Sequence, residues 1–114
     1  MDSSDVFAHL SIARLDQAEA WYTALIGRAP DARPKYNLME WHEHEGRFQL
    51  REDRDHAGSG TITLKVDDLA AERARIVEAG IRAGKLENSS GRRHLRLVDP
   101  SGNLVVLEAS AALE

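Results

Sequence analysis

The feature that most constrains the fold is an order of structural signals that occurs twice along the 114 residues. Val6 to Ala13 alternates apolar and polar side chains, which is typical of a strand, and the same alternation returns at Thr61 to Val66, about 54 residues later. A helical pattern follows each strand, and the turn glycines Gly46 and Gly102 match at an offset of about 56. An internal duplication of a strand, a helix and three strands explains this repeat.

Within the first repeat, Asp16 is predicted to cap a helix that runs to a left-handed stop at Gly27. The segment 28–35 contains two prolines, so a strand there should be short or lie at a sheet edge. Strands are predicted over 37–42 and 47–52, with Gly46 in the turn between them.

In the second repeat, Asp67 or Asp68 is predicted to cap a helix that ends at Gly80. An extended segment over 81–86 and a flexible segment over 87–91 should follow. The stretch 95–109 then predicts a closing hairpin, because Asp99, Pro100, Ser101 and Gly102 suit the corners of a type I turn.

This closing stretch, Asp-Pro-Ser-Gly-Asn followed by Leu-Val-Val-Leu-Glu, resembles the last hairpin of the vicinal oxygen chelate superfamily, which contains glyoxalase I, ring-cleaving dioxygenases and bleomycin-resistance proteins. The segments 15–27 and 66–69 resemble the starts of its two helical regions. The resemblance implies an α+β fold of two tandem βαβββ modules, whose curled mixed sheet forms a half-open cup with the helices outside. We expect one domain over 1–114, with module one at about 5–53 and module two at about 60–110. The alternative is a ferredoxin-like domain, which has two strands after its first helix.

Charge and composition indicate which kinds of partner to expect. The formal net charge is −4 and the basic residues are dispersed, so we expect no nucleic-acid partner. The chain has no cysteine, a polar start and no apolar run near the ~18 residues of a membrane span, so we expect a cytoplasmic protein without a membrane partner. Because so short a chain holds a single small core, we also expect a homodimer.

Strand parity predicts which side chains line the cup, because alternate residues of a strand face opposite sides of a sheet. If the aliphatic set packs under the helices, the other set faces a small organic ligand. The candidate ligand-binding residues are Phe7, His9, Glu40, His42, Gln49, Thr61, Thr63, His94, Arg96, Val98, Leu104 and Val106. Of the last strand, this assignment offers only Leu104 and Val106 to the cup.

Metal-using members of the superfamily bind one divalent ion at four positions, which fall here on Phe7, Gln49, Thr61 and Val106. None is a histidine or a carboxylate, so we expect no metal and no other cofactor. A different site built from His9, Glu40, His42 and His94 has ligand types that suit zinc, iron or manganese and stays open as an alternative.

Several of these residues also have an ordinary structural interpretation. His9 fits a partly buried histidine hydrogen-bonded to a neighbour, and His42 with His44 fits a solvated turn, since the pair lacks the H-E-x-x-H spacing. Trp21 is expected in the core. Arg96 either pairs with Glu40 or receives an anionic group of the ligand.

The sequence therefore favours a metal-independent protein that binds an organic ligand in its cup, with no catalytic residue assigned. The alternative is a metal-dependent lyase or dioxygenase of the same superfamily that uses non-standard ligands. A metal-free enzyme with His9 or Glu40 as general base, and a purely protein-binding role, also stay open.

Overall fold

The computed structural model describes residues 6–43 and 46–110. The first module contains a strand, a helix and three further strands: β1 (Val6–Ile12), α1 (Leu15–Ile26), β2 (Ala32–Lys35), β3 (Leu38–Glu43) and β4 (Gly46–Glu52). The second follows a short 3-10 turn at Arg54–His56 and repeats the order: β5 (Thr61–Lys65), α2 (Leu69–Glu78), β6 (Glu87–Ser89), β7 (Arg92–Val98) and β8 (Leu104–Ser110).

Each module forms its own four-stranded mixed sheet. The strand orders are β1-β4-β3-β2 and β5-β8-β7-β6, with β1 parallel to β4 and β5 parallel to β8. Three strands follow each helix, which excludes the ferredoxin-like alternative and confirms the fold of two tandem modules.

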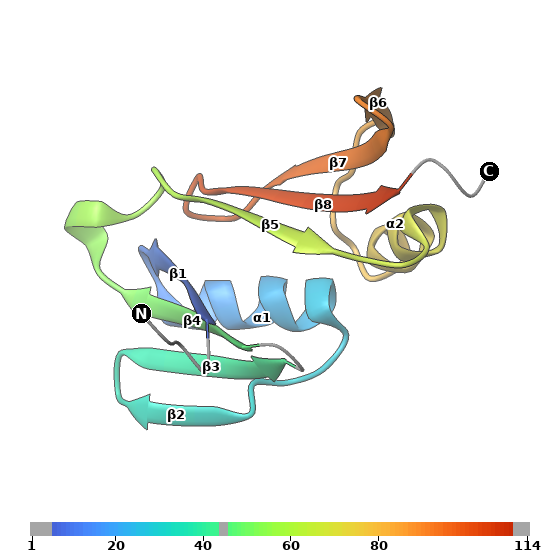
Figure 1. Cartoon of the computed structure of the whole chain (residues 1–114). Helices are drawn as coiled ribbons and strands as arrows, with labels where there is room; N and C mark the ends of the chain where they lie inside the picture. Colours follow the sequence, from blue (N-terminus) through green and yellow to red (C-terminus); the bar gives the residue numbers. More distant parts are fainter. Residues whose placement is uncertain (1–5, 44–45, 111–114) are drawn as a thin grey trace.

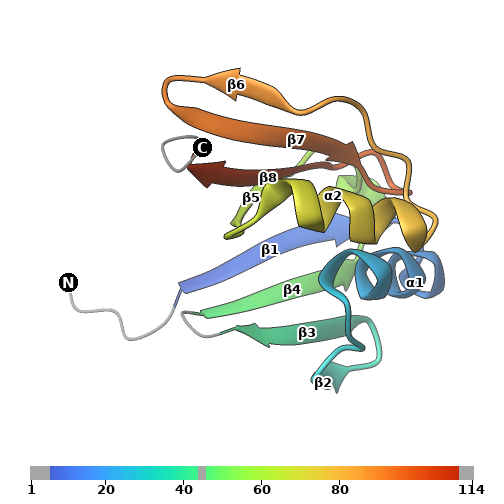
Figure 2. The ribbon, with the colours of Figure 1, turned by 90° about the vertical axis from the view of Figure 1, so that its right-hand side faces the viewer.

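The two sheets meet at their edge strands β1 and β5 (Figure 1). Both helices lie on one side of the paired sheets, close to one another (Figure 2). Beneath them the apolar strand faces of both modules form one core, which includes Leu10, Ile12, Tyr22, Trp41, Phe48, Ile62, Ile76, Leu95, Val105 and Leu107. Fully burying an aliphatic or aromatic side chain of this kind contributes roughly 1.5–3 kcal/mol. The opposite side of the sheets, which carries Phe7 and His9 on β1, is called the concave face below.

The turn between β7 and β8 fastens the two modules together. Asp99 is buried and accepts hydrogen bonds from its own turn, at 2.8 Å from the Ser101 amide and 2.9 Å from the Asn103 amide. It also accepts a 2.7 Å hydrogen bond from the hydroxyl of Tyr22 on α1. Burial first, and then this hydrogen bond, raises the pKa of Tyr22, so the hydroxyl stays protonated. The turn is thus a structural link and lies on the helix side of the sheets.

Asn103 completes this link. Its side chain is fully buried, accepts from the Gly60 amide at 2.9 Å and donates to the Ser11 carbonyl at 2.9 Å. Ser101 adds a third cross-module contact, because its hydroxyl accepts from the Ala13 amide at 2.8 Å.

Two local predictions were wrong. The N-cap of α1 is Arg14 and not Asp16, and the free amide of Leu15 is satisfied at 2.8 Å by the Glu52 carboxylate across the module. The segment 81–86 forms no strand; the edge strand β6 lies at 87–89, where flexibility was expected. Trp21, by contrast, packs against the core as expected, although it is only partly buried and the fully buried aromatic residue of α1 is Tyr22. The start of α2 agrees with the prediction: Asp68 is its N-cap, and the Asp68 side chain accepts from the Ala71 amide at 3.0 Å.

Neither described helix is long and apolar enough to cross a membrane.

Candidate functional site on the concave face

The strand register arranges the concave face of the first sheet in two rows of paired residues. Phe7 on β1 pairs with Arg47 on β4, which pairs with His42 on β3. One step along the strands, His9 pairs with Gln49, which pairs with Glu40. The alternate residues Met39 and Trp41 are fully buried in the core, so Glu40 lies on the concave side, as strand parity predicted.

Glu40 is the centre of these rows, and only 4% of it is exposed. Its Oε2 accepts from Gln49 Nε2 at 2.6 Å, and its Oε1 lies 3.1 Å from His42 Nε2 and 3.4 Å from Arg47 Nη1. Burial opposes ionisation, but the hydrogen bonds from Gln49 and His42 and the charge of Arg47 outweigh it, and the pKa of Glu40 lies below its ordinary value. The concave face therefore holds a fixed negative charge.

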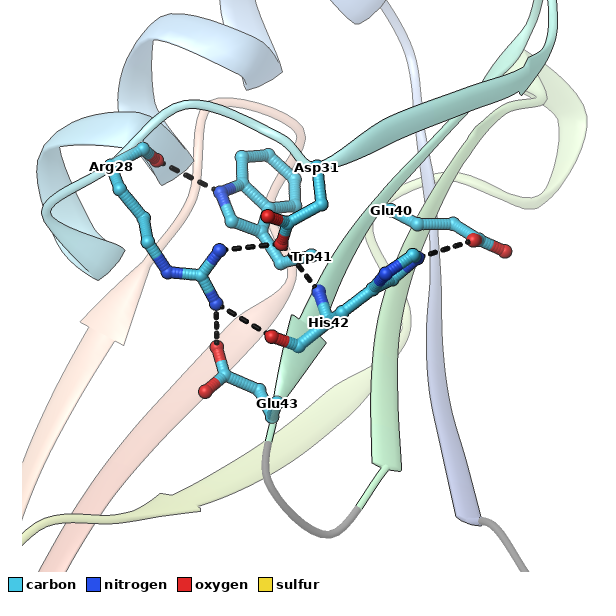
Figure 3. Close-up of polar contacts among 6 residues, drawn as sticks. All are labelled: Arg28, Asp31, Glu40, Trp41, His42 and Glu43. Atoms are coloured by element: carbon cyan, nitrogen blue, oxygen red, sulfur yellow. Dashed lines mark hydrogen bonds and ion pairs between the residues drawn. The ribbon is translucent and has the colours of Figure 1, made fainter.

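A backbone clamp fixes the strand that carries Glu40. Arg28 donates to the His42 carbonyl at 2.8 Å and to Asp31 at 2.5 Å, and Asp31 in turn accepts the His42 amide at 2.7 Å. On the core side, Trp41 Nε1 donates to the Arg28 carbonyl at 2.9 Å. Figure 3 shows the His42 ring turned away from this clamp and toward Glu40. The clamp thus sets the parity of β3 that the alternation predicted.

The second sheet carries a hollow of about 390 Å³ on the same face. It is lined by Thr63, Glu87, Asn88, Ser89, His94, Arg96, Val106 and Glu108. His94 Nε2 lies 3.0 Å from Glu108 Oε1, and Arg96 Nε lies 3.4 Å from Glu87 Oε1. Four of the sequence-predicted residues, Thr63, His94, Arg96 and Val106, are therefore brought together here.

Two assignments on this sheet need correction. Arg96 does not pair with Glu40, because its partner is Glu87 on β6. The last strand offers a third residue, Glu108, which lies opposite His94 and two positions beyond Val106 on the same face. The period of two that selected Leu104 and Val106 also selects Glu108, so the signal was present in the sequence.

The remaining predicted residues surround these two groups. Thr61, Leu104 and Val98 form an adjacent row, in which Val98 is 65% exposed. His9 is exposed beside Gln49, so the expectation of a partly buried histidine was wrong. His42 lies in β3 with its ring against Glu40, and not in a solvated turn as the sequence suggested. His44, the second member of that predicted pair, lies outside the described residues.

The donor set does not fit the metal site of the superfamily. The four corresponding positions hold the phenyl ring of Phe7, the amide of Gln49, the hydroxyl of Thr61 and the apolar Val106. Within 6–43 and 46–110, no three histidine, cysteine or acidic side chains come together in a metal-binding group. The alternative set is also divided, because Glu40 and His42 lie together in the first sheet whereas His94 contacts Glu108 in the second.

A larger cleft of about 770 Å³ lies where β1 and β5 diverge, and Arg47 and Thr63 line it together with residues of both helices. Arg75 of α2 closes its helix side by donating to the carbonyls of Ala24, at 2.9 Å, and Leu25 at the end of α1. Thr63 lines both this cleft and the hollow of the second sheet.

The chain is similar to solved structures over nearly its whole length. A glyoxalase/bleomycin resistance protein from Catenulispora acidiphila DSM 44928 is 30% identical, with a TM-score of 0.86 over 94% of this chain and 98% of that one. TnmS3, an antibiotic-binding protein from Streptomyces sp. CB03234, is 20% identical, with a TM-score of 0.80 over 96% and 97% of the two chains. A lactoylglutathione lyase from Agrobacterium tumefaciens is 17% identical, with a TM-score of 0.78 over 96% and 95%. No family profile matches the sequence, and neither does any curated protein.

Two βαβββ modules that share a core beneath their helices and leave a concave sheet face open define a protein of the vicinal oxygen chelate superfamily. Within that superfamily, the chain belongs to the glyoxalase/bleomycin resistance protein family.

Proposed function

We propose that the protein binds a small organic molecule on its concave face without a metal ion. The observation that carries this proposal is the concave face itself, where exposed apolar groups stand beside ordered polar ones. Phe7 is 48% exposed next to the Glu40 cluster, and Val106 lies in the hollow with His94 and Arg96. A few placed polar groups among apolar ones are typical of small-molecule sites.

The donor chemistry supports the metal-free form of this function. Amide, hydroxyl, phenyl and isopropyl groups at the four metal positions provide no imidazole or carboxylate to bind a divalent ion. The antibiotic-binding relative supports a binding role for this family fold.

The test is thermal melting of chelator-treated protein against a library of organic acids, cations and neutral aromatics. A ligand that binds only the folded state stabilises it by about 2.7 kcal/mol at a hundred times its dissociation constant. We expect hits without added metal, and we expect Phe7→Ala or Arg96→Ala to weaken them. Val77→Ala on α2 and Arg82→Ala are matched controls, because Val77 is similarly exposed, at 44%, and both lie away from the concave face.

Two results would contradict the proposal. One is a melting shift that requires zinc, nickel, manganese or iron(II) with about one ion per chain. The other is a set of ligands whose binding is unchanged by both concave-face variants.

A further inference from the structure

Arg47 occupies a position that is built for a cation. Its guanidinium carbon lies 5.3 Å from the centroid of the Phe7 ring, over the ring. Its Nη1 lies 3.4 Å from Glu40 Oε1. A planar cation is thus held between an aromatic face, which attracts cations through its quadrupole, and a carboxylate.

The two partners of that cation differ in how firmly they are held. The Glu40 side chain is 6% exposed and is fixed by Gln49 and His42 as well as by Arg47. The Arg47 side chain is 42% exposed, and its ion pair with Glu40 is long. Because the guanidinium is half exposed and its contact with Glu40 is long, water replaces part of what it loses when it moves away, and the buried carboxylate then needs another cation in its place. If Arg47 leaves, the carboxylate stays in place and loses its countercharge.

We propose that this is a cation site occupied by the chain's own Arg47, and that the ligand of the concave face carries an amidinium or guanidinium group that replaces it between Phe7 and Glu40. This inference rests on the proposed function, because it names the ligand class of the same face. Arg47 then acts as an internal competitor, which lowers the affinity of any cation that replaces it.

The second sheet offers a weaker case for an anionic ligand than the first sheet offers for a cationic one. Arg96 and Glu87 are both exposed, with side-chain exposures of 66% and 57%, so their separation would leave neither charge buried. His94 and Arg92 lie 3.0 and 3.6 Å from Glu108. The carboxylate whose charge is buried, and whose loss of a partner therefore matters most, is Glu40.

The test is an NMR titration of the full chain with three probes of one shape: benzamidine, neutral benzamide and anionic benzoate. We expect only benzamidine to shift amide signals around Phe7, Glu40 and Arg47. Arg47→Met keeps the apolar stem and removes the competitor, so it should tighten benzamidine binding by at least about twofold, the smallest effect expected from a hydrogen-bonded contact. Arg82→Met is the matched control and should leave the affinity unchanged.

Two further variants test the partners of the cation. Glu40→Gln keeps the shape of the side chain and should weaken benzamidine binding at least about tenfold, as for a lost hydrogen bond to a charged group. Phe7→Leu should weaken it by about two- to fivefold. Because Phe7 is half exposed, this second variant keeps the test valid if Glu40→Gln does not fold.

The inference is overturned if Arg47→Met weakens benzamidine binding, or if benzoate binds these residues in preference to benzamidine. If library ligands bind the concave face while benzamidine binds neither wild type nor Arg47→Met, this inference fails and the proposed function stands. If benzamidine and every library ligand leave the concave-face signals unchanged, both fail.

Discussion

Replacing Asn103 with alanine should lower the unfolding free energy more than any other single change in the closing turn, because Asn103 links the two modules. The side chain is fully buried and satisfies the Gly60 amide and the Ser11 carbonyl, each at 2.9 Å, while also donating to Asp99 Oδ2 at 2.9 Å. Alanine leaves two backbone groups without this partner. A buried polar group that loses its partner costs about 1–3 kcal/mol, and because both hydrogen bonds are only partly buried we expect a loss in the lower part of that range for the two together, roughly 2–4 kcal/mol in unfolding free energy.

Urea unfolding followed by far-UV circular dichroism measures this loss, together with thermal melting. At roughly 4 °C per kcal/mol for a domain of this size, the midpoint should fall by about 8–16 °C. Asn88→Ala on the exposed strand β6 is the matched control and should stay within about 0.5 kcal/mol of wild type. A loss below about 1 kcal/mol for Asn103→Ala would refute the reasoning that this turn joins the modules.

Asn103→Asp sharpens the same test. Aspartate still accepts from Gly60 but cannot donate to Ser11, and it places a second carboxylate beside Asp99. Two carboxylates at this distance do not both ionise readily. We therefore expect Asn103→Asp to be less stable than Asn103→Ala at pH 7 and to recover relative to it near pH 4; the opposite pH trend would contradict this.

Three further predictions concern single positions. The pKa of Glu40 is lowered on folding, so the Glu40 carboxylate stabilises the fold above its unfolded pKa near 4.5, and this stabilisation is lost as the pH falls through the folded pKa. In urea unfolding, the stability difference between wild type and Glu40→Gln should therefore shrink between about pH 6 and pH 3, and a constant difference would contradict this. Tyr22→Phe removes the buried hydrogen bond to Asp99 and should lower the unfolding free energy by about 1–3 kcal/mol in urea unfolding, with little change in the m-value. An unchanged unfolding free energy would contradict the role of this hydrogen bond in joining α1 to the closing turn. Gly58→Ala should destabilise by more than about 1 kcal/mol in thermal melting, because φ is +89° and the new Cβ would meet the Ser101 carbonyl oxygen at 2.3 Å; an unchanged midpoint would show that this approach is not tight.

The repeat and the strand parity could be predicted because both depend on local alternation. Met39 and Trp41 on one side of β3, and Glu40 and His42 on the other, follow from the period of two once the apolar set is assigned to the core. The fold followed from the order of the elements and from the closing turn, which the resemblance identified.

The partners of the charged residues could not be predicted, because they come from distant segments. Glu87 meets Arg96 only because β6 pairs with β7, and the sequence Glu-Asn-Ser of β6 has no apolar alternation to mark a strand. Tyr22 and Asp99 are 77 residues apart, and nothing local to either indicates their hydrogen bond. Glu108 differs, because the period of two included it and the assignment simply ended two residues too early.

Binding of an organic molecule to the concave face without a metal can be followed at individual residues. The most direct measurement is an amide NMR titration of chelator-treated protein with the strongest ligand from the melting screen. We expect shifts on β1, β4, β5 and β8 around Phe7, Gln49, Thr63 and Val106, and an affinity that added zinc or nickel does not change. Shifts confined to α1 and α2, or binding that appears only after a metal is added, would contradict it.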